Sequence, residues 1–285
     1  MLRRTSPRSA AHYDAITDAW RYIFGEHFHY GYFASPEVEL PAATRALIDE
    51  LAALADINET TRVLDIGCGI GAPALYLNEK FGCQVTGITT SEKGLELARA
   101  RSREHGYSDR VRFRLADGTR SGLPAESFDL GWALESSHLM DKGRLFAECH
   151  RLLGSGGRLL LCDVMLRRPI TPLDHFKNLF DLRWSYVSGY LSLKRAYGRG
   201  RTESFDDYRS KLAAAGFGQV QLIDVSRQTL PTMRKWRENM EKNRSEILRS
   251  FSEAEFRYFE RASFLMEHLF ERGMLGYGLV RAVKL

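Results

Sequence analysis

The sequence predicts an α/β protein with a doubly wound, seven-stranded and mostly parallel sheet of the Rossmann-like type, carrying helical lid insertions. Short apolar and β-branched runs recur along the chain, helical patterns separate the first five of them, and a glycine-rich turn follows the first. Strands and helices that alternate at this rhythm favour a parallel sheet. The expected strands cover residues 62–66, 84–88, 111–115, 128–134, 158–162, 219–225 and 276–283.

Helices are expected between these strands, over residues 72–81, 92–105 and 143–153. Ser91 stands directly before the second of them and has the side chain of an N-cap. Four residues rich in glycine, Gly154-Ser155-Gly156-Gly157, are expected to end the third helix before the fifth strand begins.

Three stretches do not fit this alternation and are expected to form lids or ordinary helical packing around the core. The predicted division is a helical N-terminal lid over residues 1–50, a cofactor-binding core over 51–164, a lid insertion over 165–205, and the rest of the core over 206–285. Within that last part, residues 228–274 are expected to form a helical insertion that is amphipathic around Phe251, Phe256, Phe259 and Phe264.

Composition excludes several classes of protein. No apolar run reaches the roughly 18 residues of a membrane-spanning helix, so no membrane contact is expected. Four scattered cysteines without a C-x-x-C spacing indicate reduced thiols and a cytoplasmic protein. The net charge of +5 includes basic clusters over residues 3–8 and 194–201, which are expected to be a solvated surface rather than a nucleic-acid patch. A homodimer is possible.

The most informative motif follows the first strand, where Asp65 precedes three alternating glycines in a D-x-G-x-G-x-G turn. Glycine lets the backbone approach a ligand closely, and this spacing differs from the G-x-G-x-x-G fingerprint of dinucleotide sites. The turn resembles motif I of the class I S-adenosylmethionine (SAM)-dependent methyltransferases. The resemblance implies SAM as cofactor, with Asp65 beside its sulfonium or amino group and its methionine part lined by Gly67, Gly69 and Gly71.

The strand ends that follow extend this resemblance. The run G-I-T-T-S at the second strand is similar to the tocopherol, sugar and sarcosine methyltransferase subgroup, and it places Thr89 where most relatives have a ribose-binding acid. Thr90 beside it is also expected to bind the cofactor. Asp117 and Gly118 follow the third strand, where the resemblance implies contact with adenine. Leu134 ends the fourth strand and is expected to offer its backbone carbonyl to the amino group of SAM.

An aromatic run over residues 20–33 resembles the entry segment of small-molecule methyltransferases such as the rebeccamycin sugar O-methyltransferase. That resemblance implies that His29 and Tyr30 close over SAM, because aromatic faces suit a sulfonium cation. The alternative is that the run only packs the lid against the core. Altogether the resemblance covers roughly residues 10–240.

Methyl transfer to an oxygen often requires a base, and two residues near the expected sheet edge are candidates. His138 follows the fourth strand and Asp163 ends the fifth. In the sugar O-methyltransferases a His and an Asp occupy these places, which implies that His138 is the base and that Asp163 is its partner or a second contact to the acceptor.

A rival interpretation starts from Glu135, since the run Glu135-Ser136-Ser137 also resembles prenyl diphosphate C-methyltransferases. There the Glu stabilises a carbocation, and a diphosphate would be held here by Lys194, Arg195, Arg199 and Arg201. We therefore expect a SAM-dependent methyltransferase that acts on a small molecule, with a hydroxyl group of a secondary metabolite as the favoured methyl acceptor. The alternatives are C-methylation, N-methylation of a small amine, or a SAM-binding subunit without activity; no metal cluster is expected.

Overall fold

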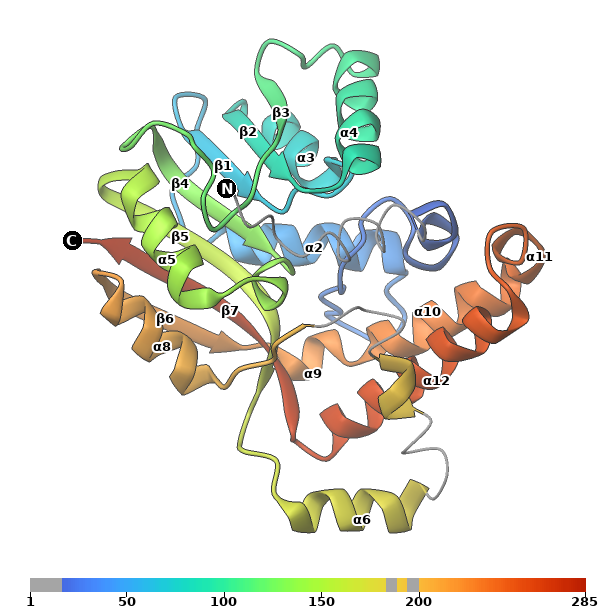
Figure 1. Cartoon of the computed structure of the whole chain (residues 1–285). Helices are drawn as coiled ribbons and strands as arrows, with labels where there is room; N and C mark the ends of the chain where they lie inside the picture. Colours follow the sequence, from blue (N-terminus) through green and yellow to red (C-terminus); the bar gives the residue numbers. More distant parts are fainter. Residues whose placement is uncertain (1–16, 183–188, 194–199) are drawn as a thin grey trace, which may run out of the picture.

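The computed structural model describes residues 17–182, 189–193 and 200–285 (Figure 1). The first part of the expected N-terminal lid and two stretches of the expected 165–205 insertion lie outside the described residues. Three of the four basic residues considered as diphosphate ligands also lie there: Lys194, Arg195 and Arg199.

A seven-stranded sheet forms the centre of the protein, in the strand order β3-β2-β1-β4-β5-β7-β6. The first five strands pair in parallel, whereas β7 runs antiparallel to both β5 and β6. This confirms the predicted mostly parallel, doubly wound sheet. The order reverses between β1 and β4, and ligands of such sheets bind beside that point. The strands are β1 (Arg62–Ile66), β2 (Gln84–Thr89), β3 (Val111–Leu115), β4 (Phe128–Leu134), β5 (Leu153–Leu166), β6 (Phe217–Asp224) and β7 (Leu275–Lys284).

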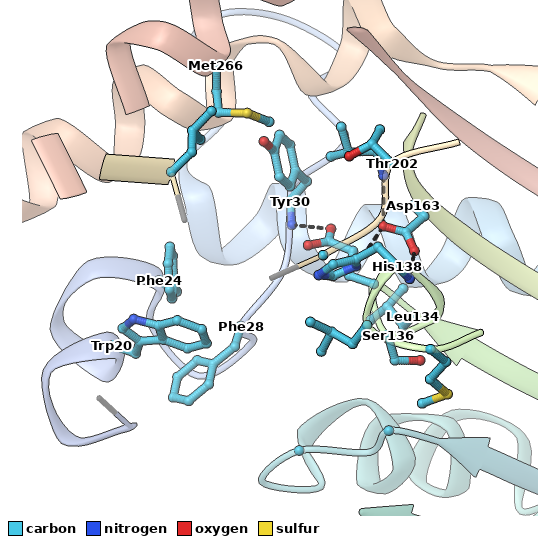
Figure 2. A pocket seen from close by; sticks show the side chains of 18 of the residues that line it. Trp20, Phe24, Phe28, Tyr30, Leu134, Ser136, His138, Asp163, Thr202 and Met266 are labelled. Carbon is cyan, nitrogen blue, oxygen red and sulfur yellow. Dashed lines mark hydrogen bonds and ion pairs between the residues drawn. The ribbon is translucent and has the colours of Figure 1, made fainter. Parts of the chain in front are cut away.

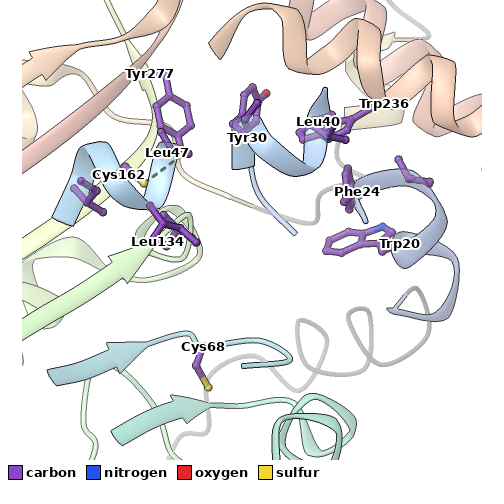
Figure 3. Packing of buried hydrophobic residues seen from close by; sticks show 14 of the residues in the cluster. Trp20, Phe24, Tyr30, Leu40, Leu47, Cys68, Leu134, Cys162, Trp236 and Tyr277 are labelled. Carbon is purple, nitrogen blue, oxygen red and sulfur yellow. Dashed lines mark hydrogen bonds between the residues drawn. The ribbon is translucent and has the colours of Figure 1, made fainter. Parts of the chain in front are cut away.

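Helices cover both faces of this sheet (Figure 1). On one face, α5 (Lys142–Leu152) and α8 (Phe205–Ala214) bury Phe146 and Leu212 in a common core. The other core joins α2 (Leu40–Ala52), α3 (Ala72–Phe81) and α4 (Glu92–Glu104) to the sheet, and Figure 3 shows part of it. As expected, the Ser91 hydroxyl caps α4, where it accepts a hydrogen bond from the Gly94 amide at 2.8 Å.

The expected helical insertion consists of α10 (Pro231–Lys242), α11 (Arg244–Ile247) and α12 (Glu253–Glu271). A capping box between Ser252 and Glu255 fixes the start of α12. Phe259 of α12 packs edge-on against Trp20, with ring centroids 6.2 Å apart, so the insertion rests on the helical residues 17–24. The remaining elements are η1 (Ser137–Leu139), α6 (Pro172–Leu182) and α9 (Ser226–Thr229).

Two expectations about these elements are wrong. The glycines at 154–157 do not separate α5 from the next strand, because β5 already begins at Leu153, which is buried and pairs with Phe128. Phe264 does not belong to the buried face of α12; it is 54% exposed, and the guanidinium of Arg237 lies 4.1 Å from its ring centre. That cation–π contact stabilises the Phe264 ring at the surface.

None of the helices in the described ranges combines the length and the apolar character that crossing a membrane requires. The four cysteines are all buried and free, as their scattered positions predicted.

Candidate active site

A cavity of about 560 Å³ opens at the carboxyl ends of the parallel strands, a size typical of small-molecule sites (Figure 2). Its walls come from the loops after β1 to β5, from the N-terminal aromatic segment, and from α10 and α12. Four predicted site residues do not line it: Asp65, Gly71, His29 and Asp117. The predicted residues that do line it are Gly67, Gly69, Thr89, Thr90, Gly118, Leu134, Tyr30, Glu135, His138 and Asp163.

The glycine turn after β1 combines a tight contact with an open position. A Cβ added at Gly67 would lie 2.4 Å from the Cβ of Ser136, whose hydroxyl donates to the Ile66 carbonyl at 2.5 Å. This glycine therefore lets the ends of β1 and β4 meet. Gly69 has a φ of +53°, and a Cβ there would meet no atom of the described residues within 4 Å. A side chain at Gly69 would occupy space that the turn leaves open to a ligand.

Two buried acceptor atoms of the predicted SAM-binding residues have no hydrogen-bond partner within the described ranges. The first is Oδ2 of Asp65, and burial raises the pKa of this carboxyl to about 7. The second is Nε2 of His29, whose Nδ1 donates to the Tyr30 carbonyl at 2.7 Å; burial lowers the pKa of His29 to about 3. Unpaired buried acceptors are costly, so a ligand carrying a cation or N–H donors complements them. The ammonium and sulfonium of SAM fit this requirement.

The side chains expected to bind ribose and adenine already take part in local turns. Thr89 Oγ1 accepts from the Ser91 amide at 3.2 Å, which leaves its own hydroxyl hydrogen for a ligand. Asp117 Oδ1 accepts from the amide and the hydroxyl of Thr119, both at 2.8 Å. Gly118 is held close to Ile66, because a Cβ there would lie 2.7 Å from Ile66 Cγ2. The contacts of Asp117 with adenine stay a prediction.

His138, in the short helix η1 after β4, meets Asp163 of the neighbouring strand β5. The expectation that Asp163 ends the fifth strand is wrong, because antiparallel pairing with β7 extends β5 to Leu166. His138 Nδ1 lies 3.0 Å from Asp163 Oδ1, and the His138 amide donates to Asp163 Oδ2 at 2.8 Å. The Ser137 hydroxyl also donates to Oδ2, at 2.6 Å. Asp163 is almost fully buried, whereas the imidazole remains open to the cavity. The carboxylate thus fixes the ring with Nδ1 toward Asp163, as in general-base pairs.

The charges of this pair are coupled. Burial lowers the pKa of His138, but the Asp163 carboxylate and its hydrogen bond outweigh burial, and the pKa ends above its usual value. For Asp163, burial raises the pKa, and the attraction of His138 together with the His138 and Ser137 hydrogen bonds brings it below the usual value. An ionised Asp163 at neutral pH therefore supports proton uptake by His138.

Glu135 directly follows β4 in a strained backbone conformation, with a φ of +49°. Its Oε1 accepts hydrogen bonds from the Tyr30 amide at 2.7 Å and from the Tyr277 hydroxyl. Burial raises the pKa of Glu135 to about 8, although both hydrogen bonds oppose that rise. At neutral pH the group is mainly an uncharged carboxylic acid.

The wall facing these polar groups is aromatic and apolar. Trp20, Phe24 and Phe28 line it together with Trp236 and Met266 (Figure 2). Phe24 also packs edge-on against Trp236 at 4.6 Å, so the aromatic run both lines the cavity and packs the lid. No lysine or arginine lines the cavity in the described parts of the chain. Across these parts, no three His, Cys, Asp or Glu side chains gather as a metal site.

Sequence reasoning missed several residues that hold this site together. The Tyr277 hydroxyl donates hydrogen bonds to the Glu135 carboxyl and to Cys162 Sγ. The Tyr208 hydroxyl lies 2.7 Å from the Ser137 hydroxyl. Both tyrosines stand on distant elements, β7 and α8, so no local spacing could reveal them. Only a general sequence signal covers Tyr208, which falls within the roughly 10–240 residues that resemble small-molecule methyltransferases.

Comparisons with known proteins agree with this site. The family model described as mycolic acid cyclopropane synthetase matches residues 2–277. The methyltransferase GfsG of Streptomyces halstedii is 35% identical over 224 residues, which cover 78% of this chain and 76% of GfsG. The 27-O-demethylrifamycin SV methyltransferase of Amycolatopsis mediterranei (strain S699) is 34% identical over 259 residues, 90% of each chain.

Among solved structures, that of the [4+2]-cyclase SpnF superposes with a TM-score of 0.80 at 26% identity, covering 100% of this chain and 97% of SpnF. These relationships confirm the predicted fold and the predicted use of SAM. The chain belongs to the mycolic acid cyclopropane synthetase family and is a SAM-dependent methyltransferase that acts on a small molecule.

Proposed function

We propose that this enzyme methylates a hydroxyl group of a largely apolar secondary metabolite, with His138 as general base and Asp163 as the residue that orients it. The contact that carries the proposal is the 3.0 Å approach of His138 Nδ1 to Asp163 Oδ1, at a ring that lines the cavity. The activity of the rifamycin relative, whose name specifies an oxygen acceptor, supports the same choice of atom.

When bound, SAM would supply a methyl carbon bonded to a cationic sulfur, and in-line attack of the acceptor oxygen on that carbon would displace the sulfur. His138 takes the hydroxyl proton on Nε2 as the oxygen–carbon bond forms, while the electron pair of the breaking carbon–sulfur bond stays on sulfur. Asp163 stabilises the imidazolium that results. The aromatic wall around Trp20, Phe28 and Trp236 excludes water and accommodates apolar parts of the acceptor.

C-methylation of a prenyl diphosphate has less support from the same cavity. A carbocation is stabilised by an anion, whereas burial raises the pKa of Glu135 to about 8 and leaves it mostly uncharged. Of the four basic residues considered for the diphosphate, only Arg201 is described, and it does not line the cavity. N-methylation of a small amine would leave most of the apolar wall unused.

A methyl-transfer screen over phenols, macrocyclic and sugar alcohols, amines and prenyl diphosphates tests this proposal directly. We expect turnover with an alcohol, and a loss in His138→Ala on the order of 10²–10⁴ in kcat with unchanged binding of S-adenosylhomocysteine (SAH). Turnover of a prenyl diphosphate alone, or normal rates in His138→Ala, would overturn it. SAM binding without SAH production from any acceptor would favour a silent binding subunit.

Four buried free thiols support the reducing compartment expected from the sequence, which we take to be the cytoplasm. The homodimer stays a prediction.

A further inference from the structure

Lys142 occupies an unfavourable place for an ammonium group. It lies in the first turn of α5, only 1% exposed, where it loses hydration and faces the positive end of the helix dipole. Its Nζ lies 5.1 Å from the Tyr208 ring centre and donates one hydrogen bond, to the Arg201 carbonyl at 2.7 Å. Within the described residues it forms no ion pair. The ammonium group of Lys142 thus has the backbone carbonyl of Arg201, outside α5, as its hydrogen-bond acceptor.

The residue whose carbonyl Lys142 binds, Arg201, also contacts the backbone of the proposed base. On its other side, Arg201 donates its amide hydrogen to the His138 carbonyl at 2.8 Å. Gly200 lies against the imidazole itself, since a Cβ added there would be 2.8 Å from His138 Cδ2. The φ of Gly200 lies outside the left-handed region, so close approach rather than backbone conformation favours glycine here.

The imidazole is therefore confined from two directions. The carboxylate of Asp163 holds Nδ1, and Gly200 closes the space beside Cδ2, which leaves the Nε2 edge for the acceptor. A ring held in this way keeps its lone pair within reach of a hydroxyl, and small misplacements of catalytic groups reduce rates strongly.

We propose that Lys142 is a positioning residue for methyl transfer: by holding the Arg201 carbonyl, it keeps Gly200 against the imidazole of His138 and so fixes the direction of the base. This inference rests on the proposed role of His138. It predicts that Lys142 affects the chemical step while leaving SAM binding and folding nearly unchanged.

The first test is Lys142→Met, which keeps the aliphatic stem and removes the donor. We expect kcat to fall about 10-fold, with unchanged KM for SAM. We expect no large fall in unfolding temperature, because the relief from burying an unpaired ammonium group offsets the one hydrogen bond that is lost. The matched control is Lys211→Met. Lys211 Nζ binds the side chain of Glu203, two residues after Arg201, at 2.6 Å and has no contact with His138. Equal kcat values for wild type and Lys142→Met would overturn the inference.

If Lys142→Met fails to fold, two glycine-to-alanine variants test the same inference. Gly200→Ala must displace the imidazole or the segment, so we expect kcat to fall at least 10-fold with normal SAH binding. Gly143→Ala is the control, because its Cβ would meet only Asp141 Oδ1 at 3.5 Å, an ordinary contact. Normal kcat in Gly200→Ala would contradict the proposed positioning.

A double variant separates this inference from the proposed function. If Lys142 acts through His138, adding Lys142→Met to His138→Ala lowers the residual kcat no further. If Lys142→Met instead lowers kcat by the same factor in the wild type and in His138→Ala, Lys142 has a role independent of His138 and the inference is overturned. Normal kcat in His138→Ala would instead overturn the proposed function, whereas a slow His138→Ala beside a normal Lys142→Met would overturn the inference alone.

Discussion

The hydroxyl of Tyr277 on β7 donates a hydrogen bond to Glu135 Oε1, which also accepts from the Tyr30 amide. One oxygen of this carboxyl thereby joins the last strand, the end of β4 and the N-terminal segment. Because burial raises the pKa of Glu135 to about 8, the group performs this role as a neutral acid at pH values below that. Its charge is not what holds the three elements together.

Glu135→Gln should therefore retain kcat within about threefold of wild type near pH 7, because Gln matches the protonated carboxyl and its oxygen accepts both hydrogen bonds. Glu135→Ala leaves the Tyr277 hydroxyl and the Tyr30 amide without this acceptor, so we expect a lower unfolding temperature. Steady-state rates and thermal unfolding test both variants. A 10²-fold loss in Glu135→Gln with normal SAH binding would show that an anionic carboxylate is required, as in the carbocation alternative.

Asp163→Asn should lower kcat on the order of 10²–10⁴, since it removes the carboxylate that fixes the His138 tautomer. The pH dependence should move as well. Asp163 raises the pKa of His138, so its loss lowers that pKa and extends the neutral, active form of the imidazole to lower pH. We expect the acidic limb of the kcat profile to shift downward in pH. An unshifted limb would show that another group controls it, and SAH binding serves as the folding control.

The parts of this protein that local patterns determine were predictable from the sequence. Apolar runs located all seven strands, and the carboxyl ends of parallel strands meet at one edge, so Gly69, His138 and Asp163 could be placed together in advance. The start of β5 at Leu153 was not predictable, because pairing with Phe128 outweighs the turn preference of the glycines that follow.

Contacts between distant segments explain most of what the sequence left hidden. Tyr277 and Glu135 are 142 positions apart, and Tyr208 and Ser137 are 71 apart. The first pair joins β7 to the end of β4, and the second joins α8 to the short helix after β4. The partner of Lys142 is a backbone carbonyl, which carries no side-chain signature in any sequence.

The affinity for SAM should rise with pH through about pH 7, because Asp65, whose pKa burial raises to about 7, must ionise to attract the sulfonium. Protonated Asp65 at lower pH offers no negative charge, so affinity is weaker there. Calorimetry should show a rise of about 10-fold between about pH 6 and about pH 8 for SAM and a smaller rise for SAH, which lacks the sulfonium charge.

The same titration in Asp65→Asn should give SAM and SAH parallel curves. Asp129→Asn is the control, because Asp129 pairs with Arg62 at 2.7 Å on the surface, away from the cavity. A SAM-specific rise that persists in Asp65→Asn would assign the pH dependence to another group.

Replacing Gly71 of the same turn by alanine should mainly lower stability, whereas replacing Gly69 should mainly weaken SAH binding. Both have left-handed backbones, which cost an alanine about 1–2 kcal/mol of folding stability at each position. A Cβ at Gly71 would also lie 2.7 Å from Phe113 Cζ and 2.9 Å from Ala98 Cβ, so Gly71→Ala should show the larger fall in unfolding temperature. At Gly69, which lines the cavity, the added Cβ meets no atom of the described residues within 4 Å, so Gly69→Ala should weaken SAH binding at least 10-fold with the smaller loss of stability. Wild-type SAH affinity in Gly69→Ala would remove this glycine from the cofactor site, because no described residue fills the space beside it.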